Sequence, residues 1–562
     1  MRTFRSVGPV AVLLVGLAIG LAACGGSSKS SNGTTSSTST TSSGGGKQGG
    51  TITIAAGTPP LSADQGLDFT TQGTELYSVV NTPLLMFRRG VQGDAGSQIQ
   101  PALAKSMPTV SNGGKTLTFH LRSGLHYSNG QPVKASDVLR ALERDLKIPW
   151  QAASFISANI VGAADYQSGK AKTISGVKTN DKTGTITVNL VEPFAPMVDI
   201  FALSGTAPVP ASTPMKNLAS TGTIGDGPYK WGSISPGHTY TLVKNPKFDV
   251  PGLPRGHADK VVFKVNSNVL ADAESVLNNQ ADVFDPGDTL PSSLLQQVQS
   301  RASDRYQAIP TNSTYYFFLA VNQKPFSNLD ARKAVLAALD QRALSRLDSG
   351  FLTEDCHLIP DGIVGHSDPS NCTKLTGHAA DAAPNMKLAK QLMKKSGMIG
   401  QKVVVWGESR SPRKQYVDYF TNVLNNLGFR ASEKIISSGV YFTTIGASST
   451  RPQAGFGDWV QDFPNPWDFM QLFAGNAGSS LNYGYVNDPH YNTTLNSLKK
   501  QPPEKVAKQW AALDDYGVQQ GFWAAYGHEK FPKFYSDRLD FGKGVMSVEY
   551  QTDITSLQLK NS

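Results

Sequence analysis

The fold class is indicated most directly by residues 117–139, which read LTFHLRSGLHYSNGQPVKASDVL. Apolar side chains alternate along residues 117–121, and this period of two predicts a strand with one buried face. The pair Asn129-Gly130 marks a turn. Ser136 can cap a helix whose apolar residues repeat every four positions, at Val138, Leu142 and Leu146. The segment therefore predicts a strand, a turn and a helix in succession.

The same two periods continue on both sides of this segment. Strands are predicted for residues 51–55, 185–190 and 402–406, and helices for residues 74–86, 389–395 and 415–427. A longer helix, capped by Asn328 or Asp330, is predicted to run through Leu347. Strands that alternate with helices indicate an α/β protein, and a length of 562 residues predicts two or more domains.

The composition fits a soluble globular body, with 39% hydrophobic and 17% charged residues. The formal net charge is +9, but the basic residues are scattered, so nucleic acid is not an expected partner. Gly113-Gly114-Lys115-Thr116 is not a phosphate-binding loop, because position 109 is Thr and Thr116 opens a strand. No catalytic motif is found, and neither enzyme activity nor a cofactor or metal is expected.

The N-terminus predicts export. Residues 1–23 have a basic start and an apolar core, which is typical of a signal peptide. Leu21-Ala-Ala-Cys24 resembles the lipobox of bacterial lipoproteins, which implies cleavage before Cys24 and a lipid on its sulfur. Ordinary signal cleavage beside an incidental cysteine is the alternative. Residues 24–50 then form a tether rich in Gly, Ser and Thr, and the folded body is expected at the outer face of the cell membrane.

Two further cysteines, Cys356 and Cys372, enclose a loop rich in Pro, Gly, Asp and His. Because an exported protein meets oxidising conditions, a disulfide between them is predicted. The alternative is a metal site that the two cysteines share with His357 and His366.

The most unusual segment is residues 456–469, FGDWVQDFPNPWDF, which combines aromatics, prolines and aspartates. Its centre cannot be helical, because each proline lacks an N–H and disfavours a helical residue before it. Aromatic side chains beside a carboxylate suit a pocket that holds a polar group within apolar walls. A proline-rich surface turn is the alternative.

The order of these features resembles the extracellular solute-binding proteins of family 5, the peptide- and nickel-binding subunits of ABC importers. Residues 117–139 are similar to the family's strand–turn–helix signature, with Asn129 where an Asp is usual. Further similar segments lie before and after it, in the same order as in the family, at residues 101–104, 225–230, 242–246, 276–282, 315–322, 325–326 and 330–334. The resemblance extends from about residue 48 to 540.

The resemblance implies a role for Asp462. The family pattern there is roughly Trp-x-x-Asp-Tyr-x-x-Pro, and its Asp pairs with the α-ammonium group of a peptide. Trp459, Asp462 and Pro466 match this pattern, and Phe463 replaces the Tyr. A carboxylate in a closed pocket is costly unless it is paired, so an amine ligand would supply the missing charge.

Other ligand contacts are predicted with less detail. Trp459, Phe463 and Trp467 are candidate pocket walls, and Asn322 is a candidate hydrogen-bond partner of the ligand backbone. Tyr315 begins an alternating run of aromatics that either lines the cleft or fills the core. By position, the candidates that would bind a ligand carboxylate are Arg410, Arg413 and Lys414.

The resemblance implies a two-lobed α/β fold of the periplasmic-binding-protein type, with an extra subdomain in lobe one and a ligand cleft between the lobes. Lobe one is expected to comprise residues 48–307 plus 528–562, and lobe two residues 308–527. The implied function is capture of short peptides for an ABC permease and its ATPase, by a monomer. The alternatives are a non-peptide solute (an oligosaccharide, a nickel chelate or another amine), a surface sensor or an adhesin.

Overall fold

The structure is a computed structural model that describes residues 48–560, apart from residues 92, 149, 286, 288–289, 291, 476–480, 541–545 and 548–550. The predicted signal peptide, Cys24 and nearly all of the tether lie outside the described residues. Residues Gly46–Ser562 form one compact unit. Among the described helices, none combines the length and the apolar character needed to span a bilayer.

A mixed sheet of twelve strands runs through the body, in the order β16-β15-β17-β13-β18-β11-β1-β10-β9-β8, and β12 and β14 both pair with β18. The bounds of these strands are β1 Thr51–Ala56, β8 Tyr229–Ser235, β9 Thr239–Lys244, β10 Lys260–Val265, β11 Val283–Asp285, β12 Tyr306–Pro310, β13 Ser313–Leu319, β14 Leu352–Thr353, β15 Lys402–Glu408, β16 Arg430–Ile436, β17 Ala454–Val460 and β18 Trp523–Tyr535.

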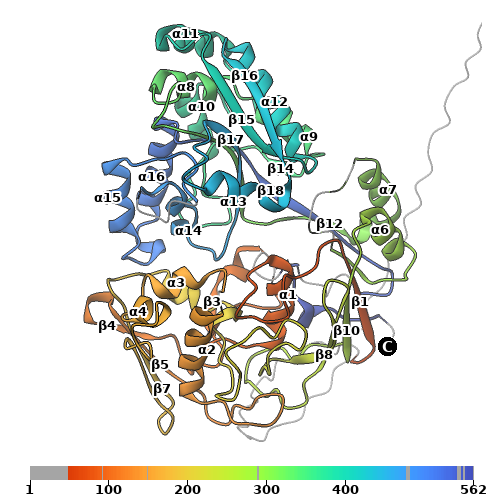
Figure 1. Ribbon diagram of the computed structural model, residues 1–562. Coiled ribbons are helices and arrows are strands. Elements are labelled where there is room, and N and C mark those ends of the chain that lie inside the picture. The colour runs from red at the N-terminus through yellow and green to blue at the C-terminus, as the bar shows by residue number, and fades with distance from the viewer. Residues whose placement is uncertain are drawn as a thin grey trace, which may run out of the picture. The chain divides into compact units, whose positions relative to one another are not determined.

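Strand β18 connects the two halves of this sheet (Figure 1). Residues 523–527 of β18 pair with β13, whereas residues 530–534 pair with β12 and residues 534–535 also pair with β11. The predicted boundary between the lobes, at residues 527 and 528, therefore falls inside one continuous strand. The lobe boundaries stay predictions, and "lobe one" and "lobe two" denote those predicted ranges below.

Three smaller sheets complete the strand list. Their strands are β2 Leu85–Phe87 with β3 Ile99–Pro101, then β4 Thr109–Ser111, β5 Thr116–His120, β6 Val177–Asn180 and β7 Thr185–Asn189 in the order β4-β5-β7-β6, and β19 Met546–Ser547 with β20 Gln551–Thr552.

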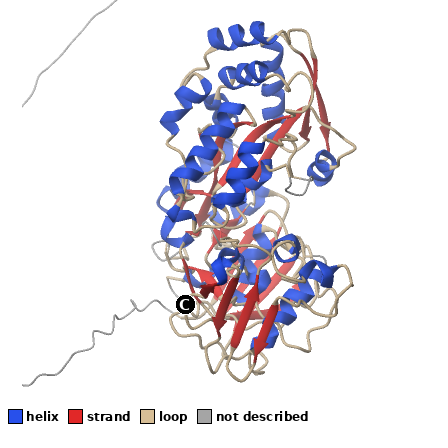
Figure 2. Cartoon of the chain, turned by 90° about the vertical axis from the view of Figure 1, so that its left-hand side faces the viewer, coloured by secondary structure: helices blue, strands red, loops and turns tan. Residues whose placement is uncertain are grey.

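In Figure 2 the strands run between helices that cover them. The helices are α1 Thr71–Val80, α2 Ala135–Lys147, α3 Ala153–Ser157, α4 Ala163–Gln167, α5 Met197–Ile200, α6 Val269–Leu277, α7 Ser292–Ala302, α8 Leu329–Ala338, α9 Gln341–Leu347, α10 Cys372–Thr376, α11 Met386–Ser396, α12 Arg413–Asn426, α13 Tyr441–Gly446, α14 Pro466–Met470, α15 Pro489–Leu498 and α16 Ala507–Gln520.

The buried apolar residues form separate cores. The largest core contains only residues between Tyr315 and Tyr526, all of lobe two. A second core contains residues between Leu84 and Val250, all of lobe one, together with Phe463. Phe463 is thus a lobe-two residue whose ring is buried in the core of lobe one.

Most of the strands and helices predicted from periodicity are confirmed, including β1, β5, β7, β15, α11 and α12. The predicted cap Ser136 is wrong: the side chain of Asp137 accepts the N–H of Lys134 at 2.9 Å, and Ser136 bonds to Asp181 instead. A carboxylate in the first turn stabilises the positive end of the helix dipole, and a serine at that point is not required.

Two predicted helices are too long. The helix predicted for residues 74–86 ends at Val80, because Pro83 disfavours helical geometry before it, and β2 follows. The helix predicted to run through Leu347 is divided into α8 and α9. Asn328 caps α8 as predicted, and Asp340 interrupts the run and caps α9 by accepting the N–H of Ala343.

Candidate functional site

The irregular segment begins where β17 ends at Val460 and continues until α14 begins at Pro466. Asn465 caps α14 by accepting the N–H of Trp467 at 3.0 Å. Its Nδ2 also donates to Asp199 of lobe one at 3.0 Å. The segment is therefore an ordered connection, held at one end by the sheet and at the other by a capped helix that is bonded to lobe one.

A carboxyl group of this segment, that of Asp462, meets one on α14, that of Asp468. Oδ2 of Asp468 accepts the backbone N–H of Asp462 at 2.7 Å and the indole N–H of Trp459 at 3.2 Å. Asp468 is fully buried, whereas Asp462 is half-buried. Asp468 is not recognisable as a site residue from the sequence, because a carboxylate that holds another carboxylate in place cannot be distinguished locally from a turn residue.

Loss of hydration raises the pKa of Asp462 to about 7, although its hydrogen bond with Asp468 acts in the opposite direction. Burial, followed by the negative charge of Asp462, raises the pKa of Asp468 well above its usual value. Among the described residues, no cationic side chain forms an ion pair with Asp462. The site thus lacks the positive charge that would balance its carboxylates.

Asp462 lines a cavity of about 70 Å³ together with Val460 and Gln461, and the remaining wall is contributed by lobe one. That wall comprises Phe69, Thr71, Thr74, Ser78, Pro83, Met86, Phe87 and residues 202–204. Thr71, Thr74 and Ser78 lie three and four residues apart on α1, so they occupy the same helical face. The cavity therefore combines a carboxylate, a row of hydroxyls and apolar side chains.

The three predicted aromatic residues, Trp459, Phe463 and Trp467, are not among the residues that line this cavity. Phe463 is completely buried, with its ring centroid 5.4 Å from that of Phe155 and 6.3 Å from that of Trp467. Trp467 also packs edge-on against Phe194 at 4.8 Å. These rings anchor the segment in lobe one, while Trp459 orients Asp468.

Tyr315 does not line the cavity either, and the pocket role predicted for it is wrong. It is 1% exposed, and its hydroxyl donates to Glu529 at 2.6 Å and accepts from Arg413 at 2.8 Å. Strand β13 is covered on both faces, so each of its alternating aromatics is buried.

Asn322 is also separated from Asp462. In the antiparallel pairing of β13 with β17, Ser313 lies opposite Val460 and Leu319 lies opposite Ala454. Asn322 follows Leu319, so at about 3.4 Å per residue it lies more than roughly 20 Å along the strand from the Asp462 end. Asn322 and Asp462 therefore cannot bind the same small ligand group, and a contact of Asn322 with another part of the ligand stays a prediction.

The candidate carboxylate-binding residues are engaged within the protein. Arg413 is 7% exposed and pairs with Glu408 and Asp458, each at 3.0 Å. Arg410 pairs with Glu408 at 3.4 Å, and Lys414 with Asp418 at 2.7 Å. The geometry gives Arg413 a structural role at the junction of β15, β17 and α12.

A second cavity, of about 740 Å³, is lined by another residue of the irregular segment. Pro464 and Asp199 line it, and so do residues 361–364, 500 and 502–504 of lobe two. Lobe one contributes an apolar group that consists of Ile99, Met107, Val110, Leu117, Phe194 and Val198. Its volume lies within the range of small-molecule sites, roughly 300–1,000 Å³, whereas that of the first cavity does not.

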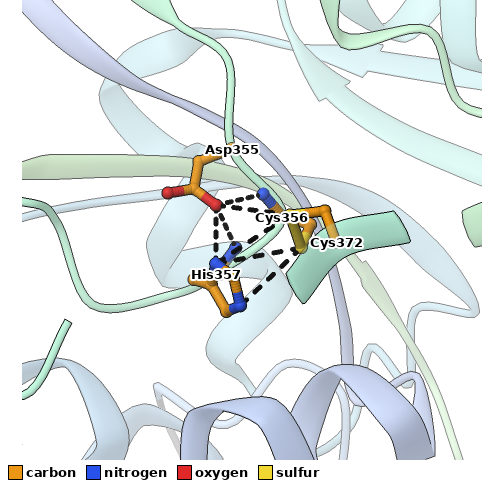
Figure 3. A group of neighbouring side chains, drawn as sticks. All are labelled: Asp355, Cys356, His357 and Cys372. Atoms are coloured by element: carbon orange, nitrogen blue, oxygen red, sulfur yellow. Dashed lines mark hydrogen bonds and ion pairs between the residues drawn. A yellow bond between two sulfur atoms is a disulfide. The ribbon is translucent and has the colours of Figure 1, made fainter. Parts of the chain in front are cut away.

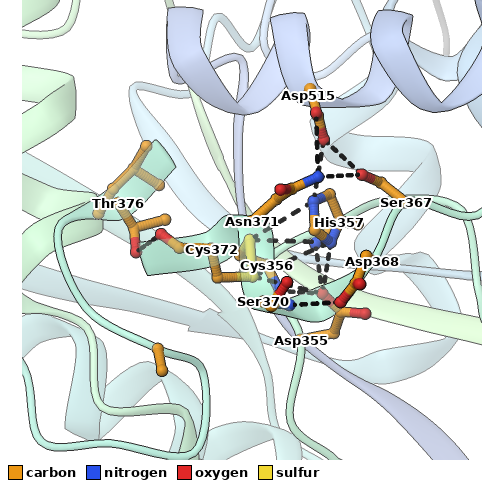
Figure 4. The surroundings of a disulfide bond; sticks show 12 residues. Asp355, Cys356, His357, Ser367, Asp368, Ser370, Asn371, Cys372, Thr376 and Asp515 are labelled. Carbon is orange, nitrogen blue, oxygen red and sulfur yellow. Dashed lines mark hydrogen bonds and ion pairs between the residues drawn. A yellow bond between two sulfur atoms is a disulfide. The ribbon is translucent and has the colours of Figure 1, made fainter. Parts of the chain in front are cut away.

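Cys356 and Cys372 form the predicted disulfide, with an S–S distance of 2.06 Å. Figure 4 shows its surroundings, in which His357 lies between Asp355 and Asp515. Burial acts to lower the pKa of His357, but hydrogen bonds to these two carboxylates raise it to about 10. The alternative metal site with both cysteines, His357 and His366 is therefore wrong, because its sulfurs are oxidised and one imidazole is charged.

The chain is similar to a known protein family and to individual proteins. A model of the bacterial extracellular solute-binding proteins, family 5, matches residues 98–480. The probable deoxycholate-binding periplasmic protein of Escherichia coli is 25% identical over 334 residues, or 58% of this chain and 60% of that protein. The probable peptide ABC transporter periplasmic-binding protein of Sinorhizobium fredii is 29% identical over 330 residues, or 56% of this chain and 57% of that protein. The chain thus matches less than two thirds of the length of each of these two relatives.

Among solved structures, the clavulanic acid biosynthesis oligopeptide binding protein 2 superposes with a TM-score of 0.81 at 21% identity, covering 91% of this chain and 96% of that one. This likeness confirms the predicted two-lobed α/β fold of periplasmic binding proteins. Because the family model matches well over half of its residues, the chain belongs to the bacterial extracellular solute-binding proteins of family 5.

Proposed function

We propose that this protein is the solute-binding subunit of an ABC importer and that it captures short peptides, whose α-ammonium group pairs with Asp462. The family consists of solute-binding proteins, and one relative is named as a probable peptide ABC transporter protein. The partners would be a membrane permease and its ATPase, so that this chain itself binds and does not catalyse.

The position of Asp462 is the observation that carries the proposal. It lines a cavity between residues of the two lobes, it pairs with no cation of the described residues, and Asp468 keeps its backbone in place. A charge-assisted hydrogen bond to an ammonium group would balance this carboxylate and contribute about 1.5–3 kcal/mol. The hydroxyls of Thr71, Thr74 and Ser78 offer further polar partners.

The size of the cavity limits how a peptide can enter. A cavity of about 70 Å³ lies well below the roughly 300–1,000 Å³ of small-molecule sites, so it does not hold a dipeptide in this arrangement. The proposal therefore includes a movement of the lobes that admits the ligand and closes on it. Small-angle scattering with and without ligand tests this step, and an unchanged radius of gyration at saturation would contradict it.

The charge of the site distinguishes the proposed ligand from the alternatives. A relative is named for deoxycholate, which is an anion without an amine. Such a ligand would bring another negative charge beside Asp462 and Asp468, which disfavours it here. An oligosaccharide, a nickel chelate or another amine remains within the receptor role, and a sensor or adhesin would keep the fold without a permease.

Native mass spectrometry of the protein purified from a peptide-rich host tests the ligand class. Peptide-mass adducts on the wild type, absent from Asp462→Asn, would support the proposal. The control is Asp249→Asn, because the side chain of Asp249 is 83% exposed and lies outside both cavities. A single non-peptide adduct, or peptide adducts that persist in Asp462→Asn, would contradict it.

Calorimetric titration separates the amine from the rest of the ligand. A dipeptide should bind the wild type at least about tenfold more tightly than its N-acetylated form, the lower limit expected for a charge-assisted bond. Asp462→Asn should remove that difference.

Export with a lipid on Cys24 is a second part of the proposal, supported by the lipobox-like sequence and by relatives named as periplasmic. Cys24→Ser should leave the chain in the soluble fraction, whereas the wild type should partition into detergent. A wild type without a lipid mass would contradict this part. The proposal also takes the protein to be a monomer, which light scattering checks.

A further inference from the structure

Three side chains that are distant in the sequence converge beside the disulfide: Asp355, His366 and His528. Oδ2 of Asp355 lies 3.6 Å from Nε2 of His366 and 3.3 Å from Nε2 of His528. All three atoms lie within 4.8 Å of one another. Asp355 and His528 are 2% and 5% exposed, and the side chain of His366 is 15% exposed. The three atoms therefore surround a point that is largely shielded from water.

The hydrogen atoms of the two imidazoles follow from their other contacts. Nδ1 of His366 lies 2.7 Å from the carbonyl oxygen of Ile359, and Nδ1 of His528 lies 3.1 Å from that of Ser313. A carbonyl oxygen only accepts, so each Nδ1 carries the hydrogen. In the neutral ring each Nε2 then carries a lone pair. An N–H donated to a backbone carbonyl is also the usual outer contact of a metal-binding histidine.

The two oxygens of Asp355 have different surroundings. Oδ1 accepts the N–H of Cys356 at 2.6 Å and is 2.7 Å from Nδ1 of His357. Figure 3 shows these contacts on one oxygen, while the other points away from them. Oδ2 is the oxygen that faces His366 and His528. The carboxylate is thus fixed on one side and presents its other oxygen to the two imidazoles.

With each Nδ1 donating outward, the two Nε2 atoms face Oδ2 of Asp355, and a single cation placed among them would contact all three atoms. Nε2 of His366 is buried without a hydrogen-bond partner among the described residues. Tetrahedral zinc, with bonds of about 2.0–2.2 Å, separates its ligand atoms by about 3.3–3.6 Å. The separations of 3.3 and 3.6 Å from Oδ2 fall within that range. We propose that Asp355, His366 and His528 bind a divalent transition-metal ion of the Zn²⁺ type.

The proposed ligands come from three parts of lobe two and its junction with lobe one. Asp355 follows β14, His366 lies in the loop that the disulfide closes, and His528 lies on β18 between the residues that pair with β13 and those that pair with β12. A bound ion would attach the disulfide loop to β18. This site shares no residue with either of the two cavities described above, so it does not depend on the proposed peptide function.

The experiment is a Zn²⁺ titration of the purified protein with its disulfide intact, followed by calorimetry and by the thermal midpoint. One ion per chain should bind, and Zn²⁺ should raise the midpoint, because a ligand that binds only the folded state stabilises it. Co²⁺ in place of Zn²⁺ should give the visible absorption of a tetrahedral site. No binding by the oxidised wild type, or binding only after reduction of Cys356 and Cys372, would overturn the proposal.

Variants locate the ion. His366→Gln and His528→Gln should each weaken binding at least about tenfold, a loss seen already for outer contacts of metal ligands. The matched control is His490→Gln, which removes an exposed histidine elsewhere. Equal affinity in all three variants would overturn the proposal. If His528→Gln fails to fold, anomalous diffraction from zinc-soaked wild-type crystals decides, since a peak away from Oδ2 of Asp355 would also overturn it.

Discussion

The backbone N–H of Asp462 donates to Oδ2 of Asp468 at 2.7 Å, so a buried carboxyl group lies directly behind the one that lines the cavity. Neither is paired with a cation of the described residues. Two neighbouring carboxyls without a counter-ion favour a shared proton when the site is empty and release of that proton when an ammonium group arrives. The affinity for the proposed ligand should therefore depend on pH.

Affinity for a peptide with a free amino terminus should rise with pH. The ammonium group pairs with the ionised carboxylate, and the pKa of Asp462 is raised to about 7, so protonation competes with the ligand below that pH. A pH of 5 lies two units below that pKa, so the dissociation constant there should be about a hundredfold larger than its limiting value at high pH. Calorimetric titrations between pH 5 and 8 measure it. An N-acetylated peptide is the control, and the same slope for both ligands would contradict the assignment.

Asp462→Asn should stabilise the ligand-free protein near pH 8. Because the folded-state pKa of this acid is raised, the folded protein holds the proton more tightly than the unfolded chain does. Its contribution to stability is complete below the unfolded pKa near 4 and is lost as the pH rises to about 7. The asparagine variant avoids this loss, so its thermal midpoint should exceed that of the wild type at pH 8 and approach it at pH 4.

The control for this measurement is Asp249→Asn, an exposed position where no such difference between pH 4 and pH 8 is expected. A lower midpoint of Asp462→Asn at pH 8 would mean that the carboxylate is stabilised within the ligand-free protein.

Arg413→Ala should lower the free energy of unfolding by about 3–5 kcal/mol, because it leaves Glu408 and Asp458 without their buried partner. Arg410→Ala is the matched control. The side chain of Arg410 is 40% exposed and reaches the same Glu408 at 3.4 Å, so its loss should cost less than about 1 kcal/mol. Urea unfolding measures both. A stable Arg413→Ala variant that loses peptide affinity would instead assign Arg413 to the ligand.

Phe463→Ala should destabilise the protein by about 3–5 kcal/mol, the usual cost of removing a buried aromatic ring. Phe463 is 0% exposed and belongs to the core of lobe one, although its chain segment continues from β17 of lobe two. The control is Val440→Ala, at a side chain that is 53% exposed. Equal midpoints in urea for the two variants would show that this ring contributes nothing to the attachment of the segment.

Local patterns predicted the elements but not their partners. The alternation in residues 117–121 predicted β5, and the repeat of Val138, Leu142 and Leu146 predicted α2. Asp462 was selected from a local motif, and the cavity contains it. The lobe-one wall around Thr71 and Thr74 was missed, because hydroxyls on a helix carry no distinctive signal.

The features that local patterns could not decide depend on long-range pairing. Whether Tyr315 or Asn322 reaches the ligand is determined by the register of β13 against β17, whose residues lie more than a hundred positions away in the sequence. The histidines near the disulfide show the same limit. Sequence neighbours suggested His357, whereas His528 approaches Asp355 from a strand 173 residues further along.

The pairing of β18 restricts which changes in chain length the protein tolerates. This strand contacts β11, β12, β13 and β14 within thirteen residues. A substitution in it affects one side chain, but a single-residue insertion or deletion reverses the facing of every residue beyond it. Such a change would misalign the pairing with β12 and β11 relative to that with β13. Length variation among homologous sequences should therefore avoid residues 523–535 and accumulate in the loops.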